Sequence, residues 1–149
     1  MRQKLIIDTD PGIDDAMAIH YAFAHPDLDV LGLTTIFGNV FVPQATRNAL
    51  LLSEQAHYLV DVAEGAAQPQ VQSLNPPSHH VHGAEGFGDV PVSQPEGTAI
   101  EMNAADYIVK KCRQHSGEVI LCPVGPLTNI AAALRADPEL VNHVQKVVI

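Results

Sequence analysis

The chain has 149 residues, of which 46% are hydrophobic, and this length and composition suit a single globular domain with a sizeable core. Eight Lys and Arg against 17 Asp and Glu give a formal net charge of −9, which argues against binding nucleic acid through its phosphates and against docking on anionic membranes. The apolar runs are too short for a membrane span or a signal peptide, and two cysteines without a CxxC pattern suggest a reduced cytoplasm.

Apolar runs and helical periodicity alternate along the chain and predict strands and helices in turn. The predicted strands are residues 4–8, 28–35, 58–62, 118–122 and 145–149. The predicted helices are residues 14–24, 44–55, 99–114 and 127–136, with a short helical turn at 139–143. Such alternation indicates βαβ units, and therefore an α/β fold with a mostly parallel, Rossmann-like open sheet flanked by helices. Residues 65–97 lack periodicity, and a loop of that length is usually functional or mobile.

Four carboxylates crowd the loop between the first strand and the first helix. Asp8 and Asp10 directly follow a buried strand, Pro11-Gly12 predicts a turn, Asp14 stands at the expected helix N-cap, and Asp15 follows it. An Asp pair at a helix start often only caps the helix, which stabilises each carboxylate by at most about 1 kcal/mol. Asp8 and Asp10 have no such role, so the cluster favours a hard divalent cation held by oxygen ligands.

Two further loops should meet this one. Asn39 follows the second strand and Val124 follows the fourth, and the carboxyl ends of parallel strands lie at one edge of the sheet. Taken alone, Asn39 is explained by a turn in the left-handed conformation. Residues 123–129 are equally explained by a plain strand-to-helix turn with local side-chain hydrogen bonds.

The run Asp8-Thr9-Asp10-Pro11-Gly12-Ile13-Asp14-Asp15 resembles the signature of the nucleoside hydrolases, the inosine-uridine-preferring N-ribohydrolase family. Residues 37–39, 81–88 and 123–129 are similar to further loops of that family. The resemblance implies that residues 1–149 are the N-terminal portion of a single nucleoside hydrolase domain whose C-terminal half is absent. The apolar run at 145–149, an edge strand with nothing after it, favours the same interpretation.

The activity that the resemblance implies is hydrolysis of the N-glycosidic bond of ribonucleosides to ribose and free base, in cytoplasmic salvage of purine and pyrimidine nucleosides. The family uses Ca²⁺ and forms homodimers or homotetramers, and this fragment alone is expected to be inactive. The implied roles are Asp10 as metal ligand and general base, Asp15 and the carbonyl of Val124 as metal ligands, Asp14, Asn39 and His82 as substrate contacts, and Asp8 as a support behind the site.

His82 lies in a stretch with three glycines that resembles the active-site flap of the family. His79 and His80 lie close by, which is compatible with a transition-metal site, but the absence of Cys or further His at finger-like spacing argues against one. A solvated loop histidine is the other interpretation of His82.

Two other functions compete with nucleoside hydrolysis. Asp8-x-Asp10 after a strand also resembles the haloacid-dehalogenase Mg²⁺ phosphohydrolases, which need Thr or Val where this chain has Gly12 and a second Asp after Asp89. The chain also lacks a phosphate-binding Gly-rich loop and a basic cluster, so a nucleoside fits better than a nucleotide. The other alternative is a truncated, inactive remnant or a scaffold that binds Ca²⁺ weakly.

Overall fold

Five parallel strands form one sheet in the computed structural model, which describes residues 2–149. The strands are β1 (Gln3–Thr9), β2 (Leu28–Thr35), β3 (Asp61–Glu64), β4 (Val119–Pro123) and β5 (Val144–Val147). Their order across the sheet is β3-β2-β1-β4-β5, and every neighbouring pair is parallel. The predicted α/β class with an open parallel sheet is therefore confirmed.

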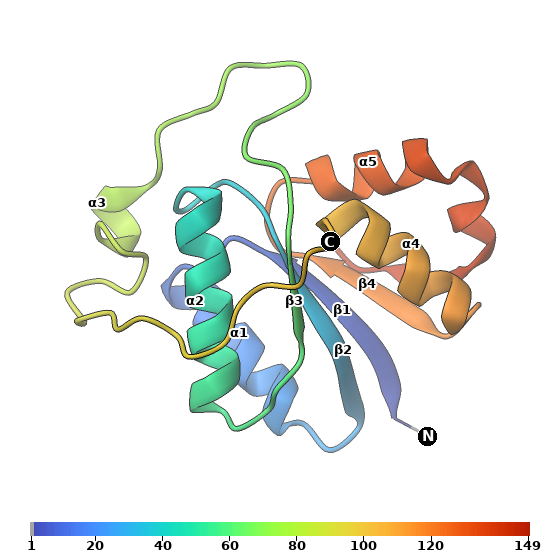
Figure 1. Ribbon diagram of the computed structural model, residues 1–149, viewed down its shortest axis with the longest axis horizontal. Helices are drawn as coiled ribbons and strands as arrows, with labels where there is room; N and C mark the ends of the chain where they lie inside the picture. The colour runs from blue at the N-terminus through green and yellow to red at the C-terminus, as the bar shows by residue number, and fades with distance from the viewer. Residues whose placement is uncertain (1) are drawn as a thin grey trace.

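Helices cover both faces of the sheet (Figure 1). The helical elements are α1 (Ile13–Ala24), α2 (Val42–Gln55), α3 (His79–His82), α4 (Ala104–Gln114), α5 (Thr128–Ala136) and a 3₁₀ turn (Pro138–Asn142). Helices α1 and α2 lie on one face, and α4 and α5 lie on the other. Within residues 2–149, no helix combines the length and the apolar character needed to cross a membrane.

The alternation of side chains along β1 explains why both faces are apolar. Leu5 and Ile7 pack with Ile19 and Phe23 of α1 in one core cluster, whereas Ile6 packs with residues of α4 and α5 in the other. A central parallel strand has both faces covered, so it is built from a continuous apolar run rather than an alternating pattern.

The sheet has its topological switch point at β1. From β1 the chain proceeds to β2 and β3 on one side, and then crosses over to β4 and β5 on the other. The loops after β1 and β4 therefore diverge to opposite faces and leave a crevice at the carboxyl edge, which is where open α/β sheets bind ligands.

Several predicted boundaries are wrong by two residues or more, and three of them have a clear structural cause. The N-cap of α1 is Gly12 rather than Asp14, so Asp14 and Asp15 both lie inside the first turn. Strand β3 begins at Asp61 instead of residue 58, because Tyr58 lies against Phe23, with the two rings stacked at 4.5 Å. Helix α4 begins at Ala104 instead of residue 99, because Asn103 caps it by accepting the Asp106 N–H at 2.9 Å.

Residues 65–97 form a long excursion between β3 and α4. The segment leaves the end of β3, passes outward beyond the end of α2, forms α3 and runs back across α2 (Figure 1). The Gly97 N–H donates to Glu54 Oε1 at 2.7 Å on the return path, which fastens the end of the excursion to α2. This segment thereby reaches the carboxyl edge of the sheet, where the carboxylate loop lies.

Candidate active site

Three loops meet at the carboxyl edge of β1, β2 and β4. The Ile36 N–H donates to the Thr9 carbonyl at 3.0 Å, and the Val124 N–H donates to the Asp8 carbonyl at 2.8 Å. These backbone bonds continue the parallel pairing beyond the strands and fix the loop after β1 between its two neighbours. The predicted convergence of the Asp10, Asn39 and Val124 loops is therefore confirmed as a structural fact.

Asp10 is the most tightly enclosed carboxylate on the cleft wall. Only 4% of the residue is exposed, and its Oδ2 accepts the backbone N–H of Asn39 at 2.5 Å. Its carboxyl group lies between Gly38 and Gly125, where a Cβ on Gly125 would come within 2.6 Å of Oδ1. Burial, with a smaller contribution from the charge of Asp15, raises the pKa of Asp10 to about 7.

Asp15 is buried beside Asp10 and accepts three hydrogen bonds. The Thr9 hydroxyl donates to Oδ1 at 2.7 Å, while the Gly12 N–H and the Asn39 side-chain amide donate to Oδ2 at 3.1 and 3.0 Å. Asn39 therefore bridges the two carboxylates, with its backbone N–H on Asp10 and its side-chain Nδ2 on Asp15. Its side-chain oxygen accepts no hydrogen bond within residues 2–149 and can accept one from a ligand.

Asp8 lies behind the cleft wall and does not line the cleft. Its Oδ1 accepts the Thr34 hydroxyl at 2.5 Å and the Asn129 amide at 2.8 Å, whereas its buried Oδ2 has no partner within residues 2–149. The same Asn129 amide donates to the Thr35 carbonyl, and its oxygen accepts the Ala66 N–H. Burial raises the pKa of Asp8 to about 6.

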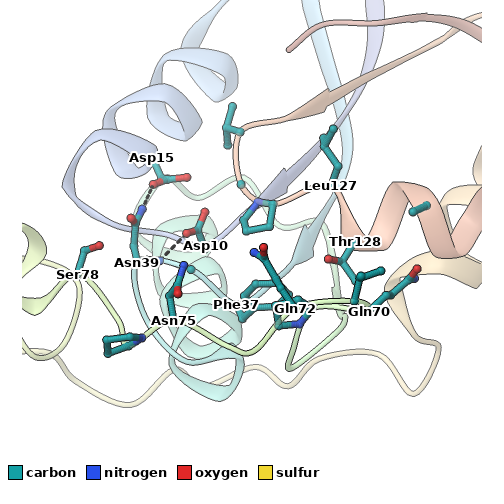
Figure 2. Close-up of a pocket in the computed structure, with 18 of the residues that line it drawn as sticks. Asp10, Asp15, Phe37, Asn39, Gln70, Gln72, Asn75, Ser78, Leu127 and Thr128 are labelled. Carbon is teal, nitrogen blue, oxygen red and sulfur yellow. Dashed lines mark hydrogen bonds between the residues drawn. The ribbon is translucent and has the colours of Figure 1, made fainter.

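A cleft of about 770 Å³ opens onto the carboxylates of Asp10 and Asp15. Figure 2 shows Asp10, Asp15 and Asn39 together at one end, with Asn75 and Gln72 of the long segment near them and Thr128 of α5 across the cleft. Asp14 and Val124 also line it. Of the residues predicted to form the site, the structure thus gathers Asp10, Asp14, Asp15, Asn39 and Val124 around one cavity.

His82 is the one predicted substrate contact that does not line this cleft within residues 2–149. It is buried at the end of α3, and its Nδ1 accepts the Ile13 N–H at 3.2 Å. The same nitrogen lies 3.7 Å from Asp14 Oδ1, which is too long for a hydrogen bond. Because Nδ1 is an acceptor, the ring proton of the neutral imidazole is on Nε2.

Several polar residues of the site were missed in the sequence. The sequence pattern indicates only local hydrogen bonds for Asn129, yet its side-chain amide donates to Asp8, 121 positions away. Gln70, Gln72 and Asn75 line the cleft from a segment whose composition gave no periodic signal. Only the length of that segment and its lack of periodicity pointed to function, and they could not indicate which side chains face the cleft.

The carboxylates fit a hard divalent cation. Asp10 and Asp15 are buried, and within the described residues neither is paired with Lys, Arg or His. Two buried carboxylates without a counter-charge are costly, and oxygen donors are what such cations prefer. No group of three or more His, Cys, Asp or Glu side chains in residues 2–149 could hold a metal by itself, so these two carboxylates need carbonyl or water oxygens beside them.

Comparisons with known proteins agree with this geometry. The family model described as "Inosine-uridine preferring nucleoside hydrolase" matches residues 5–149. The chain is 48% identical over 148 residues to uridine nucleosidase 1 of Arabidopsis thaliana, covering 99% of this chain and 44% of that protein. It is 38% identical over 152 residues to the inosine-uridine preferring nucleoside hydrolase of Leishmania major, covering 100% of this chain and 48% of that protein.

Solved structures give the same correspondence. The plant nucleoside hydrolase PpNRh1 matches with a TM-score of 0.95 and 42% identity, covering 100% of this chain and 48% of the other. The purine-preferring ribonucleoside hydrolase from Gardnerella vaginalis matches with a TM-score of 0.93 and 35% identity, covering 98% and 48%. The chain therefore spans a little under half the length of these relatives.

Proposed function

Because the chain belongs to the inosine-uridine preferring nucleoside hydrolase family, we propose that it forms the metal-binding and water-activating part of a ribonucleoside N-ribohydrolase. The reaction replaces the base at the anomeric carbon of ribose with a hydroxyl group from water. The observation that carries the proposal is the pair of buried carboxylates, Asp10 and Asp15, which Asn39 joins at the edge of the cleft. Residues 1–149 are proposed to be the N-terminal portion of this single catalytic domain.

The proposed cofactor is Ca²⁺, held by Asp10, Asp15 and the backbone carbonyl of Val124. The donor set supports it, because Ca²⁺ prefers oxygen ligands from carboxylates, carbonyls and water. When bound, the cation supplies positive charge that lowers the pKa of water and orients ribose hydroxyls. Asp15 Oδ1 accepts only one hydrogen bond in the described part of the chain, so it keeps a lone pair directed elsewhere.

Asp10 is proposed as the general base that takes the proton of the attacking water. Burial raises the pKa of Asp10 to about 7 in the metal-free chain, and a Ca²⁺ ion on the same carboxylate would lower it, so that Asp10 is ionised and can accept a proton at neutral pH. The Asn39 N–H on Oδ2 and the close approach of Gly125 to Oδ1 hold the carboxyl group in one orientation. Proton transfer then occurs at a fixed atom.

Asp14, Asn39 and His82 are proposed to contact the substrate. Asp14 lines the cleft with an exposed carboxylate that can accept a ribose hydroxyl, and Asn39 has its side-chain oxygen free for the same purpose. His82 can donate only through Nε2 while Nδ1 stays on Ile13. No Lys or Arg lines the cleft in residues 2–149, which favours a nucleoside over a nucleotide and over phosphohydrolase chemistry.

The remaining proposals concern the cellular setting. The enzyme is proposed to act in the cytoplasm, in salvage of purine or pyrimidine nucleosides, and to assemble as a homodimer or homotetramer.

Asp8 is proposed to stabilise the site from behind, since it accepts hydrogen bonds from Thr34 and Asn129 rather than facing the cleft.

The direct test of the proposed function is an assay of ribose and free base. A polypeptide of the relatives' length that contains residues 1–149 is incubated with uridine and inosine, with Ca²⁺ or with a chelator. We expect equimolar ribose and base with Ca²⁺, and a large loss of rate with the chelator. Release of inorganic phosphate from uridine 5′-phosphate without ribose from uridine would instead support the phosphohydrolase, and no turnover of either would contradict the proposal.

The raised pKa values of Asp8 and Asp10 predict how the stability of the metal-free chain depends on pH. Both carboxyls titrate near pH 4 when unfolded but near pH 6 and 7 when folded, so the folded chain binds more protons between pH 4 and 7. Their contribution is fully present below about pH 4 and is lost as the pH rises through 6 and 7. At about 1.4 kcal/mol per pKa unit, the free energy of unfolding falls by several kcal/mol.

Denaturant unfolding at pH 5 and pH 8 measures this dependence. We expect the metal-free chain to be less stable at pH 8, Ca²⁺ to restore stability there, and Asp10→Asn to flatten the profile. A metal-free chain whose stability is constant or rises from pH 5 to pH 8 would show that these carboxyls are not destabilised by burial.

A further inference from the structure

Three side chains of α2, those of Gln44, Arg47 and Asn48, form hydrogen bonds with residues 84 and 85 of the long segment. Gln44 Nε2 donates to the Ala84 carbonyl at 3.0 Å, and Arg47 Nη1 and Nη2 donate to Glu85 Oε2 and to the Glu85 carbonyl at 2.6 and 3.2 Å. Asn48 Nδ2 donates to the same Glu85 carbonyl at 2.9 Å. Residues 84 and 85 are therefore fastened to α2, which packs on the sheet.

Asn48 alone also reaches the carboxylate loop. It is fully buried, its Nδ2 donates to the Pro11 carbonyl at 3.1 Å as well as to Glu85, and its Oδ1 accepts from Arg47 Nε and Nη2 at 3.2 and 2.9 Å. Both amide hydrogens and the oxygen are thus satisfied. Gly86 packs closely against the Asn48 amide. A Cβ at residue 86 would lie only 2.7 Å from Asn48 Nδ2 and 2.9 Å from the Pro11 carbonyl oxygen, so a larger side chain does not fit there.

These hydrogen bonds, together with chain segments 11–13 and 82–85, form a closed circuit of contacts that includes His82. Pro11 is followed two residues later by Ile13, whose N–H donates to His82 Nδ1, and His82 leads three residues on to Glu85. The His82 side chain is therefore held directly by Ile13 at the N-terminus of α1 and indirectly by Asn48, through Glu85. Moving Glu85 away from Pro11 would pull His82 off Ile13.

The other part of the long segment is held differently. No hydrogen bond joins residues 67–76 to the rest of the chain within residues 2–149, and almost all of them are exposed, although Gln70, Gln72 and Asn75 line the cleft. Low burial and absent hydrogen bonds are the properties of a segment that opens at low cost in free energy. The segment thus divides into a free arm, residues 67–76, and an anchored part, residues 79–88.

We propose that Asn48 is a positioning residue that fixes the anchored part to the carboxylate loop and thereby sets His82 against α1, so that only the free arm moves over the cleft. The link to catalysis rests on the proposed function, in which His82 contacts substrate, but the link between the two loops does not. The three glycines of residues 81–88 suggested a mobile flap at that stretch, and the contacts of Asn48 assign the mobility to the free arm instead.

Hydrogen exchange of the 149-residue chain directly tests the division of the long segment into the free arm and the anchored part. In the wild type, we expect amides of residues 67–76 to exchange much faster than those of residues 79–88. Asn48→Asp keeps the shape and the acceptor for Arg47 but removes both donors, so exchange in residues 79–88 should rise about tenfold or more, the equivalent of at least one lost hydrogen bond. Asn48→Ala removes the same donors without adding a buried charge.

The matched control is Gln44→Ala, which loses the bond to the Ala84 carbonyl and the long bond from the Phe41 N–H at the start of α2; within residues 2–149 no hydrogen bond joins Gln44 to Pro11. It should change exchange in residues 79–88 by less than about threefold, since both bonds are exposed. Unchanged exchange in residues 79–88 for both Asn48 variants, or equally slow exchange of residues 67–76 in the wild type, would overturn the proposal.

The ring nitrogens of His82 separate positioning from simple structural support. Nitrogen-15 shifts should show the proton on Nε2 in the wild type and in Gln44→Ala, and a mixture of tautomers in the Asn48 variants. Ring signals that do not change would overturn the positioning role. If exchange and ring signals respond as expected while no ribose release is ever detected, the proposed function fails and the role of Asn48 stands.

Discussion

Asp10→Asn lowers the kcat of uridine or inosine hydrolysis by about 10³-fold or more in an active polypeptide that contains this chain. The substitution keeps the shape of the side chain and an oxygen that can accept the Asn39 N–H, but it removes the proposed base and one negative charge. General base catalysis alone contributes about 10²–10⁴-fold, and weaker cation binding adds to the loss. Initial rates of ribose release at saturating substrate measure the effect.

The matched control is Asp89→Asn, which neutralises an exposed carboxylate outside the cleft. Its kcat should stay within about twofold of the wild type, as expected of a surface substitution. Unfolding curves with and without Ca²⁺ establish that both variants fold and show which of them has lost the stabilisation by the cation. An Asp10→Asn enzyme that retains a tenth or more of the wild-type kcat would contradict the assignment of Asp10 as the base.

The sequence predicted those parts of the site that follow from local pattern and topology. Leu5 to Ile7 form an apolar run that had to be a buried strand, and the polar residues directly after it could only be at the carboxyl edge of the sheet. The same reasoning brought the loops of Asn39 and Val124 to Asp10. The nucleoside hydrolase resemblance, which rested on residues 8–15, is confirmed by a family match over residues 5–149.

The parts that could not be predicted depend on partners far away in the chain. Asn129 bonds Asp8, and Asn48 bonds both Pro11 and Glu85, at separations that no periodicity encodes. Both are buried asparagines on helices, a position that local pattern explains only by short-range hydrogen bonds. Their partners are known only once the sheet order is fixed.

Boundaries were missed where a tertiary contact outweighed local pattern. Residues 99–103 have a helical pattern, but the Ile100 N–H donates to the Val62 carbonyl at 2.9 Å and Ile100 pairs with Ala63 beside β3. Extending α4 backwards would break that bridge and the cap at Asn103. At α1, Gly12 takes the cap position because the Asp15 carboxylate accepts its N–H, which places Asp15 inside the helix and against Asn39.

A preparation of residues 1–149 alone is expected to release no measurable ribose from uridine or inosine. The cleft within the described residues is lined by carboxylates, amides, hydroxyls and apolar groups, and by no His, Lys, Arg, Tyr or Cys. The departing base therefore has no positioned acid to protonate it, and the loss of such an acid costs about 10²–10⁴-fold. His82 does not line the cleft, and its Nδ1 accepts the Ile13 N–H.

In the same preparation of residues 1–149, the affinity for Ca²⁺ should be reduced less than the rate of nucleoside hydrolysis, relative to the complete enzyme. Asp10, Asp15 and the Val124 carbonyl offer only part of the six to eight oxygens that Ca²⁺ takes, so water completes the shell and affinity is weak. A cleft of about 770 Å³ that is open to solvent also fails to exclude water from the reacting centre. Calorimetric titration with Ca²⁺ should therefore show weak binding that Asp15→Asn removes, alongside an absent ribose signal. Steady ribose release by a preparation shown by mass spectrometry to end at Ile149 would refute the expectation, because the residues described here would then suffice to protonate the base.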